Sequence, residues 1–140
     1  MIPWAVFDAS VVFRWMAEDP WSAAALSAAS TYAPVAPRLL SVEIANALRT
    51  QVKAQRYTAE WAVTQIGRVP QLVELRDYDR LLPMALRFGI DRDHGVYGCV
   101  YVAMALDRGL PFVTGDNRLA RKFAEVPGLE IITLADIAGQ

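Results

Sequence analysis

Apolar residues along the chain follow two patterns that alternate from one end to the other. Short apolar runs such as IPWAVFD stop at an acid and are too short for a helix, which favours buried β-strands. Longer segments repeat apolar residues at helical spacing, and the segment 37–55 places Leu40, Ile44 and Leu48 on one face. These patterns predict strands at 2–8, 32–37, 71–75, 110–116 and 129–134, and helices at 10–18, 19–30, 37–55, 58–68, 79–89, 94–109 and 117–125.

Strands that alternate with helices predict an α/β fold with a parallel sheet. We expect a three-layer α/β/α sandwich with a mostly parallel sheet of four or five strands. The strand at 32–37 is expected at an edge of this sheet, because Pro34 and Pro37 cannot donate hydrogen bonds to a neighbouring strand. The length of 140 residues is typical of one domain, so residues 1–140 are expected to form a single domain.

Composition narrows the class of protein. Hydrophobic residues make up 54% of the chain and the mean hydropathy is +0.22, which excludes a disordered protein. No apolar stretch approaches the roughly 18 residues of a membrane span, and the N-terminus lacks the basic region of a signal peptide. The net charge of −1 argues against a protein that coats nucleic acid through bulk charge, although it leaves room for a local basic rim, and the single cysteine excludes an internal disulfide. We expect a cytoplasmic protein.

Two acids directly follow predicted strands. Asp8 ends the first strand and Asp116 ends a later one, and parallel sheets place their sites beyond the carboxyl ends of strands. Carboxylates at neighbouring strand ends repel each other, and a hard cation such as Mg²⁺ or Mn²⁺ relieves that repulsion. Glu43, beside the apolar stripe of its helix, is a third candidate. Any one of these acids taken alone is more simply a helix cap or a solvated charge, and it is the pairing of two acids at strand ends that favours a site for Asp8 and Asp116.

Three motifs follow one another along nearly the whole chain. The segment VFDASVVFRWM is an apolar strand that ends in D-A-S. The segment APRLLSVEIANALR fits a P-x-L-L-x-x-E-x-x-N-A-L-x helix. The segment VYGCVYVAMALDRGLPFVTGDNRLARK fits a Y-D-A-x-Y-x-A-x-A helix followed by a strand that ends in T-x-D-x-x-L. With the three motifs in this order, the sequence resembles the PIN-domain nucleases, and specifically the VapC-type toxins of toxin–antitoxin pairs.

This resemblance implies a site built from four acids that binds Mg²⁺ or Mn²⁺. Asp8 matches the first acid of the family, Glu43 the second and Asp116 the last. These three are therefore the expected catalytic and metal-binding residues. Thr114 matches the threonine of the T-x-D turn.

Gly98 stands where the family has the aspartate of Y-D-A, since Tyr97 matches the tyrosine of that motif. Glycine has no ligating side chain, so the resemblance implies impaired catalysis. The acid was lost either in the lineage or in a cloned copy, because Asp and Gly codons differ by one base. An aspartate restored here is expected to be sterically mild near the start of a helix. His94, one turn earlier, is more simply a surface residue than a ligand, and Tyr101 more simply a packing residue.

Several polar residues near the acids are candidates for contact with the substrate. They are Ser10, Arg14, Thr114, Arg118, Arg121 and Lys122. The basic ones closely follow Asp8 or Asp116, and arginine offers a planar fork that suits phosphate. A solvated face that keeps the protein soluble explains them equally well. Ser10 either orients a water or, more simply, caps its helix.

The leading interpretation is a metal-dependent endoribonuclease, the toxin of a type II toxin–antitoxin pair. The resemblance implies an RNA substrate, a small cognate antitoxin and a homodimer, and the antitoxin is expected to place an Arg or Lys in the acidic pocket. An alternative is a catalytically inactive PIN module that binds antitoxin or RNA. A third interpretation, a phosphoacceptor receiver domain, needs an acid pair after the first strand and a lysine after a late strand. The chain offers only Asp8 there, and no such lysine.

Overall fold

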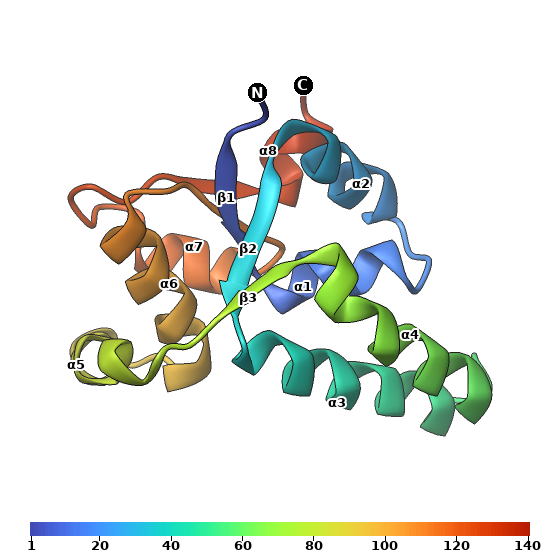
Figure 1. The fold of residues 1–140 in the computed structure, drawn as a ribbon. Coiled ribbons are helices and arrows are strands. Elements are labelled where there is room, and N and C mark those ends of the chain that lie inside the picture. Colours follow the sequence, from blue (N-terminus) through green and yellow to red (C-terminus); the bar gives the residue numbers. More distant parts are fainter.

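A five-stranded, all-parallel β-sheet lies at the centre of the protein, in a computed structural model that describes residues 1–140 (Figure 1). The strands are β1 (Trp4–Phe7), β2 (Ala33–Pro37), β3 (Glu74–Arg76), β4 (Phe112–Thr114) and β5 (Ile131–Thr133). Their order across the sheet is β3-β2-β1-β4-β5. The predicted α/β/α sandwich with a parallel sheet is confirmed.

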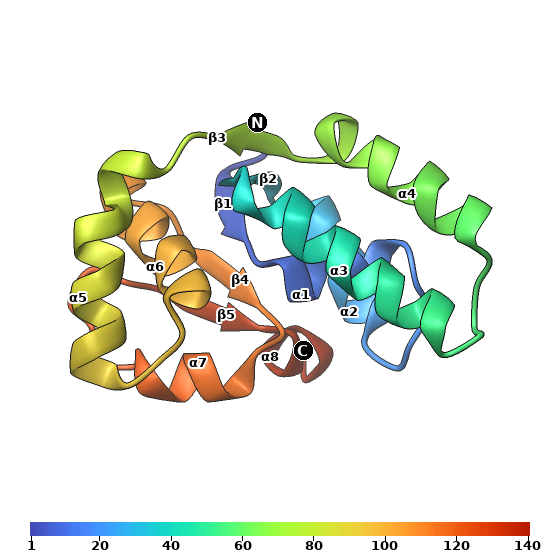
Figure 2. The same cartoon turned by 90° about the horizontal axis from the view of Figure 1, so that it is seen from below.

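Helices cover both faces of this sheet. They are α1 (Ala9–Val12), α2 (Ser22–Thr31), α3 (Leu39–Lys53), α4 (Ala59–Leu72), α5 (Leu82–Arg92), α6 (Val96–Arg108), α7 (Asn117–Lys122) and α8 (Leu134–Ala138), with short 3₁₀ turns η1 (Phe13–Trp15) and η2 (Asp79–Leu81). Helix α6 packs on one face with α5 outside it, and α1, α2 and α3 lie on the other side (Figure 2). Helix α4 packs on α3 as a hairpin that reaches away from the sheet (Figure 1). No helix is both long and apolar enough to cross a lipid bilayer.

The position of β2 corrects the expectation of an edge strand, because β2 lies between β1 and β3. Alternate residues of a strand bond to opposite neighbours: Ala33 N–H donates to Pro3 beside β1, and Arg38 N–H donates to Arg76 in β3. The backbone nitrogen of Pro34 therefore points toward β3, but pairing with β3 begins only at Val35. The backbone nitrogen of Pro37 points toward β1, but pairing with β1 ends at Val35. Neither proline removes a hydrogen bond from the ladder.

Helix α6 forms the centre of the core. Its residues Cys99–Ala105 are all buried, because the helix lies between the sheet and α5. The helix ends at Gly109, whose φ of 65° is the left-handed conformation that glycine adopts readily.

The connection between α5 and α6 differs from the prediction. Helix α5 continues through Gly89 to Arg92 and ends at Asp93, which has a left-handed φ of 49°. Helix α6 begins only at Val96, so His94 lies in the short connector rather than on the helix that carries Gly98. The conformation of this connector determines where the His94 side chain points.

Candidate functional site

Asp8 and the turn after β4 lie together at one edge of the sheet. In the parallel pairing of β1 with β4, Phe7 lies opposite Val113, so Asp8 follows at the level of Thr114. The backbone N–H of Asp8 donates to the carbonyl of Val113 at 3.0 Å. Asp8 is only 9% exposed, and Thr114 is fully buried. The pairing of β1 with β4 thus places the side chains of Asp8 and Thr114 next to each other at the edge of the core.

The T-G-D turn is tied to the end of β1 by side-chain hydrogen bonds. The hydroxyl of Thr114 donates to Oδ2 of Asp8 at 2.6 Å and accepts from the backbone N–H of Asp116 at 2.9 Å. The backbone N–H of Gly115 donates to Oγ of Ser10 at 2.9 Å. Ser10 therefore does not cap its helix: α1 begins after Asp8 and has no side-chain cap. These contacts fix both strand ends relative to each other.

Glu43 comes to the same region from helix α3. The phenol of Tyr101, on α6, donates to Oε1 of Glu43 at 2.6 Å. Tyr101 is 1% exposed, so its hydroxyl is directed by the packing of the core rather than by solvent. Sequence reasoning took Tyr101 as a packing residue only. The contact between Tyr101 and Glu43 adds a positioning role that no local pattern in the sequence showed.

The carboxylates interact electrostatically. Burial raises the pKa of Asp8, the hydrogen bond from Thr114 opposes that shift, and the charge of Asp116 adds to it. Burial also raises the pKa of Glu43, against the hydrogen bond from Tyr101, and the charge of Asp8 contributes to the increase. The three acids therefore act on one another through Asp8, and a cation at this edge would relieve their repulsion.

A test of the expected metal site gives a mixed result. Asp116 caps α7, since its Oδ1 accepts from the backbone N–H of Leu119 at 3.1 Å. No three acidic, histidine or cysteine side chains lie close enough together in the structure to hold one ion. The donor chemistry nevertheless fits Mg²⁺ or Mn²⁺, which prefer carboxylate oxygens. An ion would have to draw Asp8, Glu43 and Asp116 together, so this set of ligands stays a prediction.

The surroundings of Gly98 correct the expectation that an aspartate there is sterically mild. A Cβ on Gly98 would lie 2.7 Å from Cδ1 of Leu119 and 2.9 Å from Nε2 of His94. Carbon atoms do not approach other atoms so closely, so both side chains would have to move. Burial lowers the pKa of His94, while the charges of Asp116 and Asp8 raise it. His94 is therefore a neighbour of the acids rather than a remote surface residue.

The predicted basic residues are placed differently from one another. Arg14 is half-buried, bonded to Asp19 at 2.7 Å and to the carbonyl of Ser10 at 2.6 Å. The other three lie on α7. Arg118 and Lys122 are near enough for their charges to lower the pKa of His94, and Lys122 also binds the carbonyl of Asp93. Arg121 is exposed and makes no ion pair.

Solved structures share this fold over nearly the whole chain. The crystal structure of PAE2754 from Pyrobaculum aerophilum matches with a TM-score of 0.68 and 23% identity, over 100% of both chains. VapBC2 from Rickettsia felis, bound to a DNA fragment from its promoter, matches with a TM-score of 0.65 and 12% identity, over 95% of this chain and 98% of that one. These likenesses define the fold as a three-layer α/β/α sandwich with a parallel sheet.

Similarity in sequence is more specific. Ribonuclease VapC1 of Mycobacterium tuberculosis is 34% identical over 96 residues, which cover 67% of this chain and 68% of the relative. No family model matches the chain. The chain belongs to the VapC family of PIN-domain toxins. The resemblance seen in the three sequence motifs is thus confirmed.

Proposed function

We propose that this protein is a cytoplasmic, metal-dependent endoribonuclease, the toxin of a type II toxin–antitoxin pair, with catalysis weakened at Gly98. The activity named in its M. tuberculosis relative supports this proposal. The observation that carries it is the position of Asp8 at the end of β1, fixed by Thr114 and coupled by charge to Asp116 and Glu43. A buried acid at the end of a strand weakens a fold, and the burial of Asp8 is explained by a ligand that needs its carboxylate.

Each side chain has a separate task in this mechanism. Asp8, Glu43 and Asp116 would hold Mg²⁺ or Mn²⁺, which when bound stabilises developing charge on an RNA phosphodiester and activates water for its hydrolysis. Thr114 fixes the carboxylate of Asp8 by donating to it. Arg118 follows Asp116 in the first turn of α7, where a guanidinium can bind a phosphate next to the cleaved bond.

RNA cleavage by the purified chain tests this function. We expect slow cleavage with Mn²⁺ or Mg²⁺ and none with EDTA. The alternative, an inactive PIN module that binds antitoxin or RNA, is favoured by the missing carboxylate at Gly98. Binding of antitoxin without any cleavage, in either metal, would establish that alternative. Cleavage that continues in EDTA would contradict both.

Replacing Tyr101 by phenylalanine is expected to reduce cleavage and Mn²⁺ affinity by roughly 10–100-fold, the usual cost of losing an outer partner of a metal ligand. The phenol is the group that donates to Glu43 at 2.6 Å, and its loss leaves that carboxylate free to turn away. Tyr97→Phe is the matched control, because Tyr97 is 67% exposed. Equal losses in the two variants would show that Tyr101 does not act through Glu43. Activity and calorimetric titration would be measured on both.

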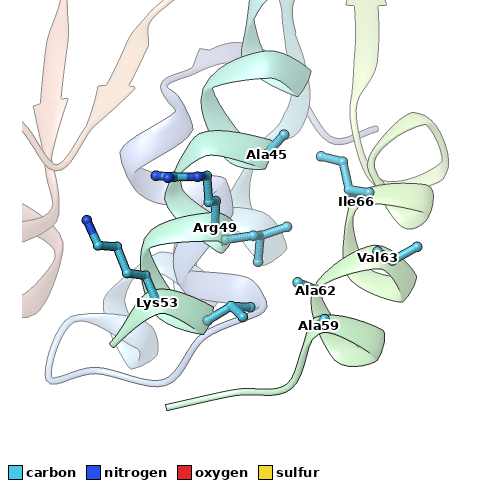
Figure 3. Close-up of a pocket in the computed structure, with 9 residues that line it drawn as sticks. Ala45, Arg49, Lys53, Ala59, Ala62, Val63 and Ile66 are labelled. Atoms are coloured by element: carbon cyan, nitrogen blue, oxygen red, sulfur yellow. The ribbon is translucent and has the colours of Figure 1, made fainter. Parts of the chain in front are cut away.

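A groove between α3 and α4 supports binding of an antitoxin. Its volume is about 410 Å³ and seven of its nine lining residues are hydrophobic (Figure 3). Arg49 and Lys53 complete its lining, and Figure 3 shows their charged ends pointing away from α4. Glu43 is on the same helix α3, so one partner could fill the groove and place a basic side chain at the acids. The solved toxin–antitoxin complexes with this fold are consistent with such a partner.

The occupant we propose is the small cognate antitoxin, through an apolar segment. Val63→Glu should weaken the complex at least roughly tenfold, because it places a charge in the centre of an apolar contact. Val63 is 71% exposed in the free protein, so the substitution should not affect folding. Leu26→Glu, at an exposed position on α2, is the control. Affinity would be measured with the small protein encoded immediately upstream, and equal affinity of all three proteins would place the antitoxin elsewhere.

An exposed apolar face on α5 and the start of α6 supports the proposed homodimer. Its large exposed side chains are Leu82, Met84, Leu86, Ile90, Val96 and Tyr97. Three of them, Leu82, Leu86 and Ile90, recur every four residues and so form one stripe on α5. A contiguous apolar face of this kind is typical of a surface that a second protein molecule covers.

A further inference from the structure

The imidazole of His94 occupies the space that a side chain at position 98 would need. A Cβ built on Gly98 would lie 2.9 Å from Nε2 and 3.2 Å from Cδ2 of His94. In an aspartate, the carboxylate oxygens lie close to the Cβ. At position 98, Nε2 of His94 lies only slightly further from the Cβ position than those oxygens would. Gly98 and His94 are complementary, because Gly98 has no side chain at the position where His94 places Nε2.

The backbone around His94 is held firmly in the connector. The N–H of His94 donates to the carbonyl of Gly89 at 3.1 Å, and Lys122 binds the carbonyl of Asp93 from α7. A Cβ on Gly89 would lie 2.9 Å from the carbonyl oxygen of His94, so only glycine allows the connector to pack this closely on α5. Position 94 is thus fixed by contacts to two helices.

The ring itself is oriented by an aromatic contact and lies among the site residues. It meets the ring of Phe123 edge-on, with centroids 6.0 Å apart and planes at 88°. Among the neighbouring charges, that of Asp116 raises the pKa of His94 most, those of Lys122 and Arg118 lower it, and that of Asp8 raises it least. Cδ1 of Leu119, three residues after Asp116 on α7, lies 2.7 Å from the same Cβ position, so the nitrogen next to Gly98 faces the helix that Asp116 caps.

We propose that His94 is the fourth metal-binding group of this site, in place of an acid at position 98. This rests on the proposed function only in that the site must bind a divalent ion. Three carboxylates and one imidazole favour ions that accept nitrogen, whereas Mg²⁺ strongly prefers oxygen. The pocket therefore binds Mn²⁺ well and Mg²⁺ poorly, in contrast to a pocket of four acids.

The test uses the full chain without an affinity tag, because His94 is its only histidine. Any imidazole nitrogen coupled to bound Mn²⁺ in pulsed electron paramagnetic resonance must then come from His94. We expect this coupling in the unaltered protein and its loss in His94→Ala. Calorimetry should show Mn²⁺ affinity reduced roughly tenfold or more, since even outer partners of ligands contribute 10–100-fold, with little change for Mg²⁺.

A third variant separates this inference from the proposed function. Asp8→Asn should prevent Mn²⁺ binding if the acids form the site. If the unaltered protein binds no Mn²⁺, both proposals fail. If Mn²⁺ binds and depends on Asp8, but shows no nitrogen coupling and the same affinity in His94→Ala, the inference is wrong while the proposed function stands. Melting temperatures in EDTA establish that each variant is folded.

Discussion

Replacing Asp8 by asparagine is expected to abolish RNA cleavage and, at the same time, to raise the melting temperature of the metal-free protein. Cleavage should fall by roughly 10²–10³-fold or more, the effect of removing one electrostatic group at a reaction centre. Stability should increase because Asp8 is buried, with 9% of the residue exposed, and its carboxylate is affected by the negative charge of Asp116. Asparagine keeps an oxygen to accept from Thr114 without the buried charge. The gain should be a few degrees, on the order of 1 kcal/mol.

The same substitution should change how stability depends on pH. The pKa of Asp8 is raised in the folded protein, so the neutral acid is favoured by folding. The stabilisation from neutral Asp8 is therefore fully present below its ordinary pKa of about 4, and it is lost as the pH rises through the pKa that Asp8 has in the folded protein. Asp107 and Glu125 act in the opposite sense, since hydrogen bonds from Arg80 and Arg92 lower their pKa values. Both are exposed ion pairs and remain in the variant.

The difference in melting temperature between the two proteins isolates Asp8. Thermal unfolding in EDTA between pH 4 and 8 should show nearly equal stability at the acidic end and a widening advantage of Asp8→Asn toward neutral pH. Added Mn²⁺ should stabilise the unaltered protein and leave the variant unchanged. A variant that melts lower than the unaltered protein at pH 7 would mean that the charge of Asp8 is already compensated within the fold.

An aspartate at position 98 is expected to increase activity without a large loss of stability only when the side chain of His94 is removed. In Gly98→Asp, the new side chain overlaps the ring of His94 and the methyl group of Leu119, and overpacking of this kind typically costs about 1–3 kcal/mol. The melting temperature should fall accordingly. In Gly98→Asp with His94→Ala, only Leu119 has to move, so part of the loss is recovered. That double variant has four acids at the site.

The double variant should cleave RNA at least roughly tenfold faster than the unaltered protein with Mg²⁺, and its expression should be toxic to the host. The two single variants and the double variant form a cycle, in which cleavage rates, melting temperatures and colony counts would be measured. A single Gly98→Asp variant as stable as the unaltered chain, with no gain of activity in either background, would show that position 98 is not part of the site.

The strand-end acids could be predicted because topology alone places them. Apolar runs that stop at Asp8 and Asp116, in a parallel sheet, must end at the same edge, whatever the details of packing. The hydrogen bond between Tyr101 and Glu43 joins residues 58 positions apart, and it depends on how α6 lies against α3. No periodicity encodes that contact.

The sequence predicts His94 on the helix that carries Gly98, and the structure places it in the connector before that helix, for a related reason. A continuous helical pattern from residue 94 onward hides a left-handed residue at Asp93, which turns the chain and moves the imidazole from the helix surface to the space above Gly98. The place of β2 was missed because both prolines fall just outside the pairing of the neighbouring strand, a matter of strand length rather than of residue type. Long-range register, unlike strand ends, cannot be read from one sequence.

The α3–α4 hairpin is anchored in the core only at its root, and its tip is tied to the rest of the protein by the N–H of Glu18, which donates to the hydroxyl of Tyr57 at 3.2 Å. Leu40, Ile44 and Leu48 hold the first turns of α3 in the core, and Val69 does the same near the end of α4. Between Leu48 and Val69 no residue is fully buried. Local stability therefore decreases from the root of the hairpin to its tip, because free energy of opening follows buried contacts. The tip can open and reclose many times while Glu43, at the root, keeps its place beside Tyr101.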